Sequence, residues 1–430
     1  MLSGLVSARR GRCRGIHVYF GLPAPMACRY GHSTMNRPVT SKLPLLLGLL
    51  IAVGPVSTDM YLPAFPDIAH EFANQAAPQE SLAAYFVGLA VGQMTQGALS
   101  DRLGRRLPLL IGLILYTVAS LGCALSHSVE GLVLFRFLSA LGASAGVVIP
   151  RAMVRDLADG PEAARLYSKL MLVMGVAPIC APMLGAAFVG WFSWRAIFYA
   201  TTVYGVAAVA LTWRFLPDTL PLNRRTSLGP LNVMLRYGRI LKEHAFLAYT
   251  IVATANSACL FAYLGATPQI FINEFGWSNT GYALLFGVNS TAYIGYNQLN
   301  PMLVGRFGLH RVVSFGVATL LATTALLALF ALLGLGAYAI AFGLLLSELA
   351  FGLLMPCVMV GALSRHQAHA GSAAALLGTV QFTGGAIAGL AVGWLNDGTA
   401  RPMGFIMLIC ALIAVAGSFA RPKLVFASGE

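Results

Sequence analysis

The sequence predicts an all-α membrane protein with twelve transmembrane helices in two pseudo-symmetric six-helix bundles. Hydrophobic residues make up 58% of the 430 residues and charged residues only 10%, whereas soluble proteins average about 25% charged residues. Runs of roughly 20 apolar residues, the length that crosses a bilayer as a helix, recur along the chain. Helices are the expected spanning form because open strands would leave backbone polar groups unpaired in lipid.

One long connection divides the predicted spans into two sets. The spans lie near residues 43–64, 81–100, 107–126, 130–150, 168–191, 195–215, 245–268, 281–303, 312–334, 337–360, 372–395 and 403–420. The connection 216–244 is polar and basic and separates six spans from six. We therefore expect a first bundle at 41–215, a cytoplasmic linker at 216–244, a second bundle at 245–420 and a cytoplasmic tail at 421–430.

Residues 1–40 differ from the rest of the chain and are predicted to form a disordered, basic extension. The first 34 residues contain five arginines and no acidic residue. They also lack an apolar run long enough for a signal peptide. A non-native upstream start, with Met26 or Met35 as the native first residue, is the preferred interpretation, and an organelle transit peptide is the alternative.

Lys and Arg are distributed unevenly between alternate connections. Nearly all of them lie in the even-numbered connections and at the chain ends, whereas the odd-numbered connections hold only Arg195 and Arg401. Cytoplasmic loops carry this excess, so we expect both termini to be cytoplasmic. The net charge of +13 is scattered between apolar runs and forms no patch, which argues against a nucleic-acid partner.

Five segments carry a recognisable pattern. They are Thr-Asp-Met-Tyr-Leu-Pro-Ala-Phe-Pro at 58–66, the loop 97–106, Arg136-Phe137, the proline- and glycine-containing run 175–186, and His-Ala-Gly-Ser-Ala at 369–373. The loop 97–106 is partly repeated at 301–310, after the eighth span. Over residues 41–420 these segments resemble the major facilitator superfamily, and within it the Bcr/CflA group of drug:proton antiporters.

The resemblance implies a multi-pass transporter of the inner (cytoplasmic) membrane, working by alternating access. It would export a small hydrophobic drug, such as a phenicol, bicyclomycin or a sulfonamide-like compound, in exchange for protons. A gating role is implied for Gly97, Asp101, Arg102, Gly104, Arg105 and Arg106. An antiporter hinge in the fifth span is implied for Gly175, Pro178, Pro182 and Gly185, with Ala186 where a second glycine is common.

Three ionisable residues inside predicted spans, Asp59, Arg136 and Glu348, are candidates for proton coupling. Asp59 lies in the apolar stretch 43–66, where a charge costs a few kcal/mol even on mild scales. Loss of hydration favours the protonated carboxyl, so Asp59 could bind and release a proton. Arg136 lies inside the fourth span and stays charged. It must therefore face a cavity or a carboxylate, and Asp59 or Glu348 is the expected partner.

Glu348 lies in the middle of the tenth span, where the resemblance assigns no residue. Three interpretations stay open. Glu348 could be a second protonation site, or it could contact a cationic or polar substrate. It could also be a neutral buried acid that is hydrogen-bonded to Ser347 or to a neighbouring helix.

Polar and aromatic residues inside the spans are candidates for substrate binding. They are Tyr61, Gln93, Asn256, Tyr263, Asn289, Tyr293 and Gln381. Broad-specificity sites are largely apolar and aromatic, with a few polar groups that orient the ligand. Hydrogen bonding between helices is the alternative role for each of them.

The motifs of several other protein classes are missing. No GxxxxGK[ST] or HExxH pattern occurs, and the seven cysteines form no CxxC pair, so we expect no enzyme activity, cofactor, metal or disulfide framework. We expect a monomer whose partners are a small-molecule drug, protons and the lipid bilayer. The alternatives are a proton-coupled transporter of a metabolite, such as a sugar, peptide or nucleobase, and a structural or sensory membrane protein.

Overall fold

The computed structural model describes residues 43–157, 160–222, 225, 230–366 and 370–422. The predicted extension 1–40, His369 and most of the tail 421–430 lie outside these ranges. Within them the chain folds into helices and turns without a strand, which confirms the all-α prediction.

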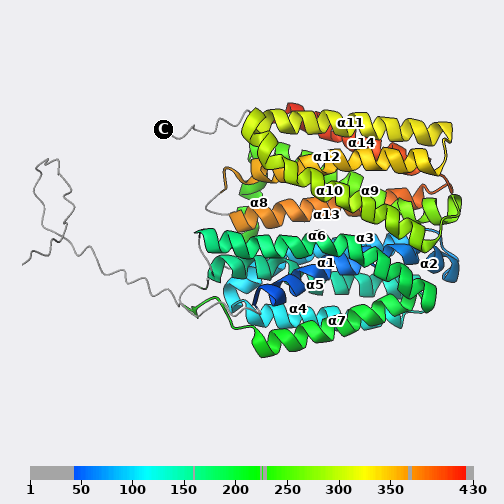
Figure 1. Cartoon of the computed structure of the whole chain (residues 1–430). Coiled ribbons are helices and arrows are strands. Elements are labelled where there is room, and N and C mark those ends of the chain that lie inside the picture. The colour runs from blue at the N-terminus through cyan, green and yellow to red at the C-terminus, as the bar shows by residue number, and fades with distance from the viewer. Residues whose placement is uncertain (1–42, 158–159, 223–224, 226–229, 367–369, 423–430) are drawn as a thin grey trace, which may run out of the picture. The chain divides into compact units, whose positions relative to one another are not determined.

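The first half of the chain contains six long helices and two short ones. Its elements are α1 (Leu43–Asp59), η1 (Leu62–Ala64), α2 (Phe65–Glu71), α3 (Ala77–Leu103), α4 (Arg106–Ala124), α5 (Val129–Leu157), α6 (Gly160–Trp191) and α7 (Trp194–Phe215). The second half repeats this plan with α9 (His244–Pro268), the π-helical turn η3 (Gln269–Glu274), α10 (Asn279–Phe307), α11 (Leu309–Leu333), α12 (Ala337–Leu363), α13 (Ala370–Trp394) and α14 (Arg401–Phe419). Figure 1 shows the two halves lying side by side.

The long helices coincide with the predicted spans. Ten helical segments of the described chain are long and apolar enough to cross a membrane. The other two long helices, α3 and α10, are the second helix of each half and carry more polar residues. Each contacts a helix of the opposite half, α3 with α13 and α10 with α6. These polar residues therefore lie on the helices that join the two halves.

The helix α1 ends earlier than the predicted span 43–64. It stops at Asp59, and η1 and α2 follow after a turn. Pro63 explains the break, because proline has no N–H and its ring clashes with the carbonyl four residues earlier, which is that of Asp59. Asp59 is consequently placed at a helix end.

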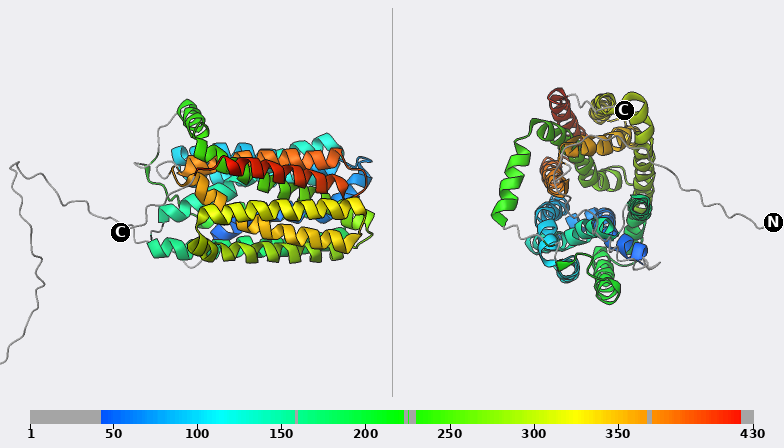
Figure 2. Two further views of the ribbon diagram at one scale, coloured as in Figure 1. Left: turned by 90° about the horizontal axis from the view of Figure 1, so that it is seen from above. Right: turned by 90° about the vertical axis from the view of Figure 1, so that its left-hand side faces the viewer.

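The connection 216–244 contains a helix that the sequence analysis did not predict, α8 (Pro230–Leu241). Tyr237 and Ile240 are buried, whereas Met234 and Leu235 on the other face are exposed. The hydroxyl of Tyr237 donates to the carbonyl of Met94 in α3 at 3.2 Å. Figure 2 shows α8, in bright green, beside the main helical body.

The two halves are packed together through an aromatic stack. The ring centroid of Phe86 in α3 lies 4.0 Å from that of Phe261 in α9 and 6.0 Å from that of Phe382 in α13. The hydroxyl of Thr379 in α13 donates to the carbonyl of Ala90 in α3 at 3.0 Å. Aromatic contacts of this kind add about 0.5–1.5 kcal/mol each beyond the burial of their surface.

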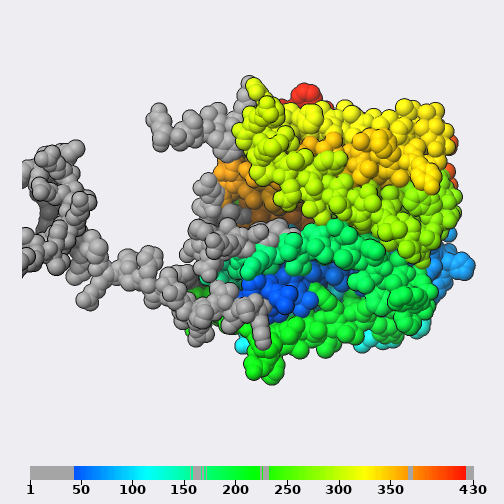
Figure 3. Space-filling model, viewed as in Figure 1, coloured from blue at the N-terminus to red at the C-terminus, as the bar shows by residue number. Residues whose placement is uncertain are grey.

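The helical body has two different ends, which we name by a residue. The Arg105 end carries the start of α1, the α3–α4 turn and α8, and the Gln269 end carries α2 and η3. Figure 3 shows the surface between the halves hollowed toward the Arg105 end and closed at the Gln269 end.

The α3–α4 turn at the Arg105 end requires a glycine. Gly104 has φ +93°, and a Cβ there would collide with the side chains of Asp218 and Arg225. The backbone N–H of the next residue, Arg105, donates to Asp218 at 2.9 Å. The turn is therefore fixed against the segment that follows α7.

Replacing Gly104 by Ala should lower the free energy of unfolding by about 1–3 kcal/mol, because the backbone conformation is nearly restricted to glycine. Gly97→Ala is the matched control. Gly97 lies within α3, and a Cβ there would have its nearest neighbour, a Val148 methyl, at 4.0 Å. Thermal unfolding in detergent, followed by circular dichroism, measures both. Equal stability of the two variants would contradict the assigned strain.

Candidate functional site

Asp59 is a buried carboxyl with a single hydrogen-bond partner among the residues that the structure describes. Its side chain is 8% exposed, and the hydroxyl of Thr58 donates to it at 2.8 Å. No lysine or arginine of the described residues pairs with it. A charge on this carboxyl would therefore be uncompensated in this conformation.

The predicted hinge helix α6 packs directly on the turn that holds Asp59. A Cβ on Gly185 would lie 2.9 Å from the carbonyl carbon of Met60, the residue after Asp59. Pro178 and Pro182 lie inside α6, where each removes a backbone hydrogen bond and bends the helix. Movement of this part of α6 would thus move the backbone beside Asp59.

Another predicted hinge residue lies at the contact between α6 and the second half. A Cβ on Gly175 would be 3.8 Å from a methyl of Ile294 in α10. The helix α6 therefore contacts the Asp59 turn at one position and α10 at another.

Arg136 in α5 has partners other than the predicted carboxylates. It is 2% exposed, and its Nη1 donates to the carbonyl of Ser57 at 3.0 Å. Its guanidinium carbon lies 4.5, 4.3 and 5.7 Å from the ring centroids of Tyr61, Tyr85 and Phe198. No ion pair to Asp59 or Glu348 is present among the described residues, so the predicted pairing is wrong for this conformation.

The aromatic faces explain how the charge of Arg136 is tolerated. Their π electrons attract a guanidinium, by about 2 kcal/mol or more where water is excluded. This attraction compensates only part of the hydration that the guanidinium loses on burial, because Nε and Nη2 have no hydrogen-bond partner among the described residues. Arg136 is therefore a buried positive charge available to any nearby developing negative charge.

Tyr61, predicted to bind substrate, belongs to this aromatic cage. It is fully buried, and its hydroxyl lies 2.6 Å from that of Ser81. No face of the ring is open to a ligand in this conformation, so a substrate role for Tyr61 stays a prediction.

Glu348 is a second buried carboxyl, 3% exposed. The hydroxyl of Ser347 donates to the carbonyl of Gly343 at 3.0 Å, so it does not bond to Glu348. No hydrogen bond or ion pair of the Glu348 carboxyl is found within the described chain. Gly352, one turn later on the same face of α12, packs against the Tyr293 backbone of α10. Glu348 is therefore on the side of α12 that faces α10.

Tyr263 in α9 interacts electrostatically with both buried carboxyls. It is within electrostatic range of both Asp59 and Glu348, and Tyr293 is within range of Glu348. The side-chain amide of Asn289 donates to the Tyr263 hydroxyl at 3.2 Å. These predicted substrate residues are thus brought together with Glu348.

The remaining predicted substrate residues are more widely spaced. Asn256 lies seven residues before Tyr263 on α9, on the same face about 10 Å away. Gln93 in α3 lies against Gly378 of α13 at the seam between the halves. The Gln381 amide donates to the sulfur of Met355 at 3.6 Å.

At the Arg105 end, two predicted gating residues, Asp101 and Arg105, take part in a charged network. Arg105 bonds through Nε to Asp156 at 2.8 Å and through Nη1 to Ser100 at 2.9 Å, and it also pairs with Asp101. Burial lowers the pKa of Arg105, but hydrogen bonds and charges of Asp156 and Asp101 outweigh it and leave the pKa above its usual value. Arg106 donates to the carbonyl of Trp213.

Every described partner of this network lies in the first half or in the segment after α7. Asp156 and Asp218 were not singled out from the sequence. Both acids lie in connections of the chain that are otherwise rich in Lys and Arg. An acid in such a connection is a candidate partner for Arg105, and this pattern could have identified them. No described ion pair at this end joins the body of the first half to the second.

At the Gln269 end, neutral side chains join the halves in what we call the amide clasp: Gln75, Gln79, Gln269 and Asn396. Gln79 donates to the carbonyl of Gly265 at 3.0 Å and to Gln269 Oε1 at 2.8 Å. Gln269 donates to the carbonyl of Gln75 at 2.9 Å and accepts from Asn396 at 3.2 Å. No motif of the sequence predicted this clasp.

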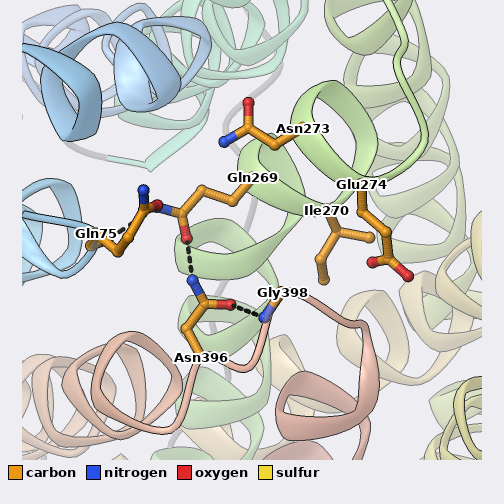
Figure 4. A pocket seen from close by; sticks show the side chains of 7 residues that line it. All are labelled: Gln75, Gln269, Ile270, Asn273, Glu274, Asn396 and Gly398. Atoms are coloured by element: carbon orange, nitrogen blue, oxygen red, sulfur yellow. Dashed lines mark hydrogen bonds between the residues drawn. The ribbon is translucent and has the colours of Figure 1, made fainter.

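The clasp borders a polar cavity. Figure 4 shows Gln75, Gln269 and Asn396 converging beside Asn273 and Glu274. The cavity has a volume of about 360 Å³. Because its walls come from both halves, it exists only while this end is closed.

One enzyme-like pattern has a structural explanation. Residues 142–146 read Gly-Ala-Ser-Ala-Gly, the spacing of a hydrolase nucleophile, which belongs on a strand-to-helix turn. Here Ser144 is fully buried inside α5, and its hydroxyl donates to the carbonyl of Leu141 at 2.7 Å. The pattern therefore serves helix packing against Gly92 of α3. No group of three or more metal-ligating side chains occurs in the part of the chain that the structure describes.

Comparison with known proteins gives matches along most of the chain. The sequence model described as Major Facilitator Superfamily matches residues 47–389. The "Uncharacterized MFS-type transporter YdgK" of Bacillus subtilis is 35% identical over 89% of this chain and 95% of its own length. The "Bicyclomycin resistance protein homolog" of Haemophilus influenzae is 31% identical over 86% and 94%.

A shorter match and two solved structures add to this. The "Chloramphenicol resistance protein" of Pseudomonas aeruginosa is 34% identical over 66% of this chain and 67% of its own length. The nucleoside transporter NupG is similar in fold, with a TM-score of 0.69 at 13% identity over 88% and 98% of the two chains. A bacterial homologue of the human lysosomal transporter Spinster gives a TM-score of 0.68 at 14% identity over 89% and 96%.

Gly185→Ala should destabilise the protein by about 1–3 kcal/mol, because the new methyl group would press on the Met60 backbone. Gly175→Ala is the matched control, since both glycines are helical but a Cβ at Gly175 meets only a side-chain methyl at 3.8 Å. Scanning fluorimetry in detergent measures the difference in midpoint. A Gly185→Ala protein as stable as the control would contradict the close packing of α6 on this turn.

Proposed function

Because this chain belongs to the major facilitator superfamily, we propose that it is a secondary transporter that exports small, mainly apolar drugs in exchange for protons. The match over residues 47–389 confirms the family prediction. Relatives named for bicyclomycin and chloramphenicol resistance support a drug as substrate. The observation that supports the proton coupling is Asp59, a buried carboxyl that has no cationic partner among the described residues and lies at a broken helix end.

The proton cycle depends on the cost of an unpaired charge in a membrane interior. When the Asp59 side is open to the outside, the carboxyl takes up a proton, because the neutral form is cheaper at this depth. When it is open to the cytoplasm, the proton leaves and drug can bind. Protonation of Asp59 and binding of drug exclude each other. This exclusion couples proton entry to drug exit.

Arg136 assists the release of this proton. Its guanidinium is attached to the carbonyl of Ser57, two residues before Asp59, and two of its nitrogens lack a hydrogen-bond partner among the described residues. A positive charge nearby stabilises an ionised carboxylate. Deprotonation of Asp59 would therefore draw the end of α1 and the aromatic cage into a different arrangement, and α6 would follow through Gly185.

Alternating access follows from the contrast between the two ends. We assign the Arg105 end to the cytoplasm, because Lys and Arg concentrate there. Both termini then lie on the cytoplasmic side, and the protein lies in the inner membrane of the cell. The amide clasp closes the outer end and the hollow lies on the cytoplasmic side, so this conformation is the inward-facing one. The two halves of one chain enclose one transport path between them. One chain is therefore sufficient for transport, and we expect a monomer.

A metabolite transporter is the alternative function. The polar set Asn256, Tyr263 and Asn289 on one side of the route could hold a sugar or nucleobase as well as a drug. The aromatic stack of Phe86, Phe261 and Phe382 favours a flat, apolar ligand, since rings of this kind bind by stacking.

Asp59→Asn should abolish drug-induced proton release, because the amide cannot carry the proton. The measurement uses a pH-sensitive dye in energised inverted vesicles with a panel of phenicols, bicyclomycin and sulfonamides. Asp67→Asn is the matched control, an exposed aspartate of α2 that should leave the signal unchanged.

Two results would oppose this assignment. Proton release that persists in Asp59→Asn would move the proton site to Glu348. Silence of the wild type across the whole panel, with the protein inserted in the membrane, would favour a metabolite as substrate.

Gln269→Leu should favour the outward-facing state by about tenfold or more, because the clasp loses three hydrogen bonds worth about 0.5–1.5 kcal/mol each. Hydrogen–deuterium exchange should rise at 75–79 and 265–270. Asn273→Leu is the control, since Asn273 lines the same cavity but makes none of the clasp bonds. Equal exchange in the two variants would show that the clasp does not close this end.

A further inference from the structure

The proposed transport cycle uses Asp59 and leaves the role of Glu348 open. Five charged residues of the described chain are buried: Asp59, Arg105, Arg136, Glu348 and Arg421. Arg105 and Arg421 lie at the Arg105 end. The interior between the ends therefore holds two acids and one base, and full ionisation leaves one uncompensated negative charge.

Glu348 and a neighbouring asparagine present acceptors without donors. Asn289, 1% exposed, donates to the Tyr263 hydroxyl and has a side-chain oxygen without a hydrogen-bond partner in the described chain. The Glu348 carboxyl likewise has no hydrogen bond or ion pair there. Buried acceptors without donors are costly, so this region is suited to a ligand that supplies N–H groups.

Aromatic rings line the same region. Tyr263 is stacked with Phe286 at 6.1 Å between centroids, and Tyr293 lies within electrostatic range of Glu348. Ring faces attract ligand cations as well as apolar groups.

We propose that Glu348 is a specificity residue that makes the site of this chain prefer protonated organic amines over neutral drugs of the same size. The amine nitrogen donates to Glu348 and to the oxygen of Asn289, while its apolar part lies against the rings. One such monocation supplies the single positive charge that the interior lacks. A neutral drug instead requires a proton on one of the two acids. This inference rests on the proposed export function and narrows its substrate class.

The test is equilibrium binding to the purified full-length protein by isothermal titration calorimetry at neutral pH. The probes are a naphthylalkyl amine and its N-acetyl derivative, which share a ring system and differ in charge. Wild type should bind the amine about tenfold or more tighter than the amide. Glu348→Gln should weaken amine binding about ten- to a hundredfold, the range for a hydrogen bond to a charged group, and change amide binding less than about twofold.

Two further variants control the experiment. Glu130→Gln, at an exposed position in the first turn of α5, should leave both affinities unchanged, and Glu348→Asp should retain the preference for the amine. Amide binding by Glu348→Gln shows that the site is folded. Equal weakening of both probes in Glu348→Gln, or the absence of an amine preference in wild type, would overturn the inference. Failure of the export function would appear separately, as absent proton exchange with neutral drugs.

Discussion

The placement of charge in a medium that cannot solvate it governs this structure. Asp59, Arg136 and Glu348 are all buried, yet none is ion-paired with another in the described conformation. Each is tolerated differently: a carboxyl beside one hydroxyl, a guanidinium against aromatic faces, and a carboxyl without a partner. Binding of a proton or of a charged ligand would stabilise such an arrangement. Because its charges are incompletely compensated, the interior can change its conformation when a proton or a ligand binds.

The two ends of the helical body use different chemistry. The Arg105 end is tied by ion pairs that involve Arg105, Asp101 and Asp156 within the first half, whereas the Gln269 end is closed between halves by the neutral amide clasp. Each amide hydrogen bond contributes little net free energy. A closure made of several weak, uncharged bonds can open without leaving a buried charge unpaired, which suits a gate that must alternate.

A mechanical connection joins the proposed proton site, Asp59, to the contact between halves. Gly185 of α6 packs on Met60 beside Asp59, and Gly175 lies near Ile294 of α10. Packed interiors transmit displacement because they contain few voids. A change of charge at Asp59 thus has a short route, through one proline-bent helix, to the second half of the molecule.

The sequence alone determined the positions of the twelve long helices and the presence of Asp59, Arg136 and Glu348 within them. These properties are local, since a helix satisfies its own backbone hydrogen bonds and its length follows from the apolar run. Only the tertiary structure decided the partners. The rings around Arg136, the amide clasp, the burial of Tyr61 and the helix α8 all depend on which side chains meet across helices far apart in sequence. Apolar spans with almost no repeating polar face carry little information on that pairing, so it had to come from packing.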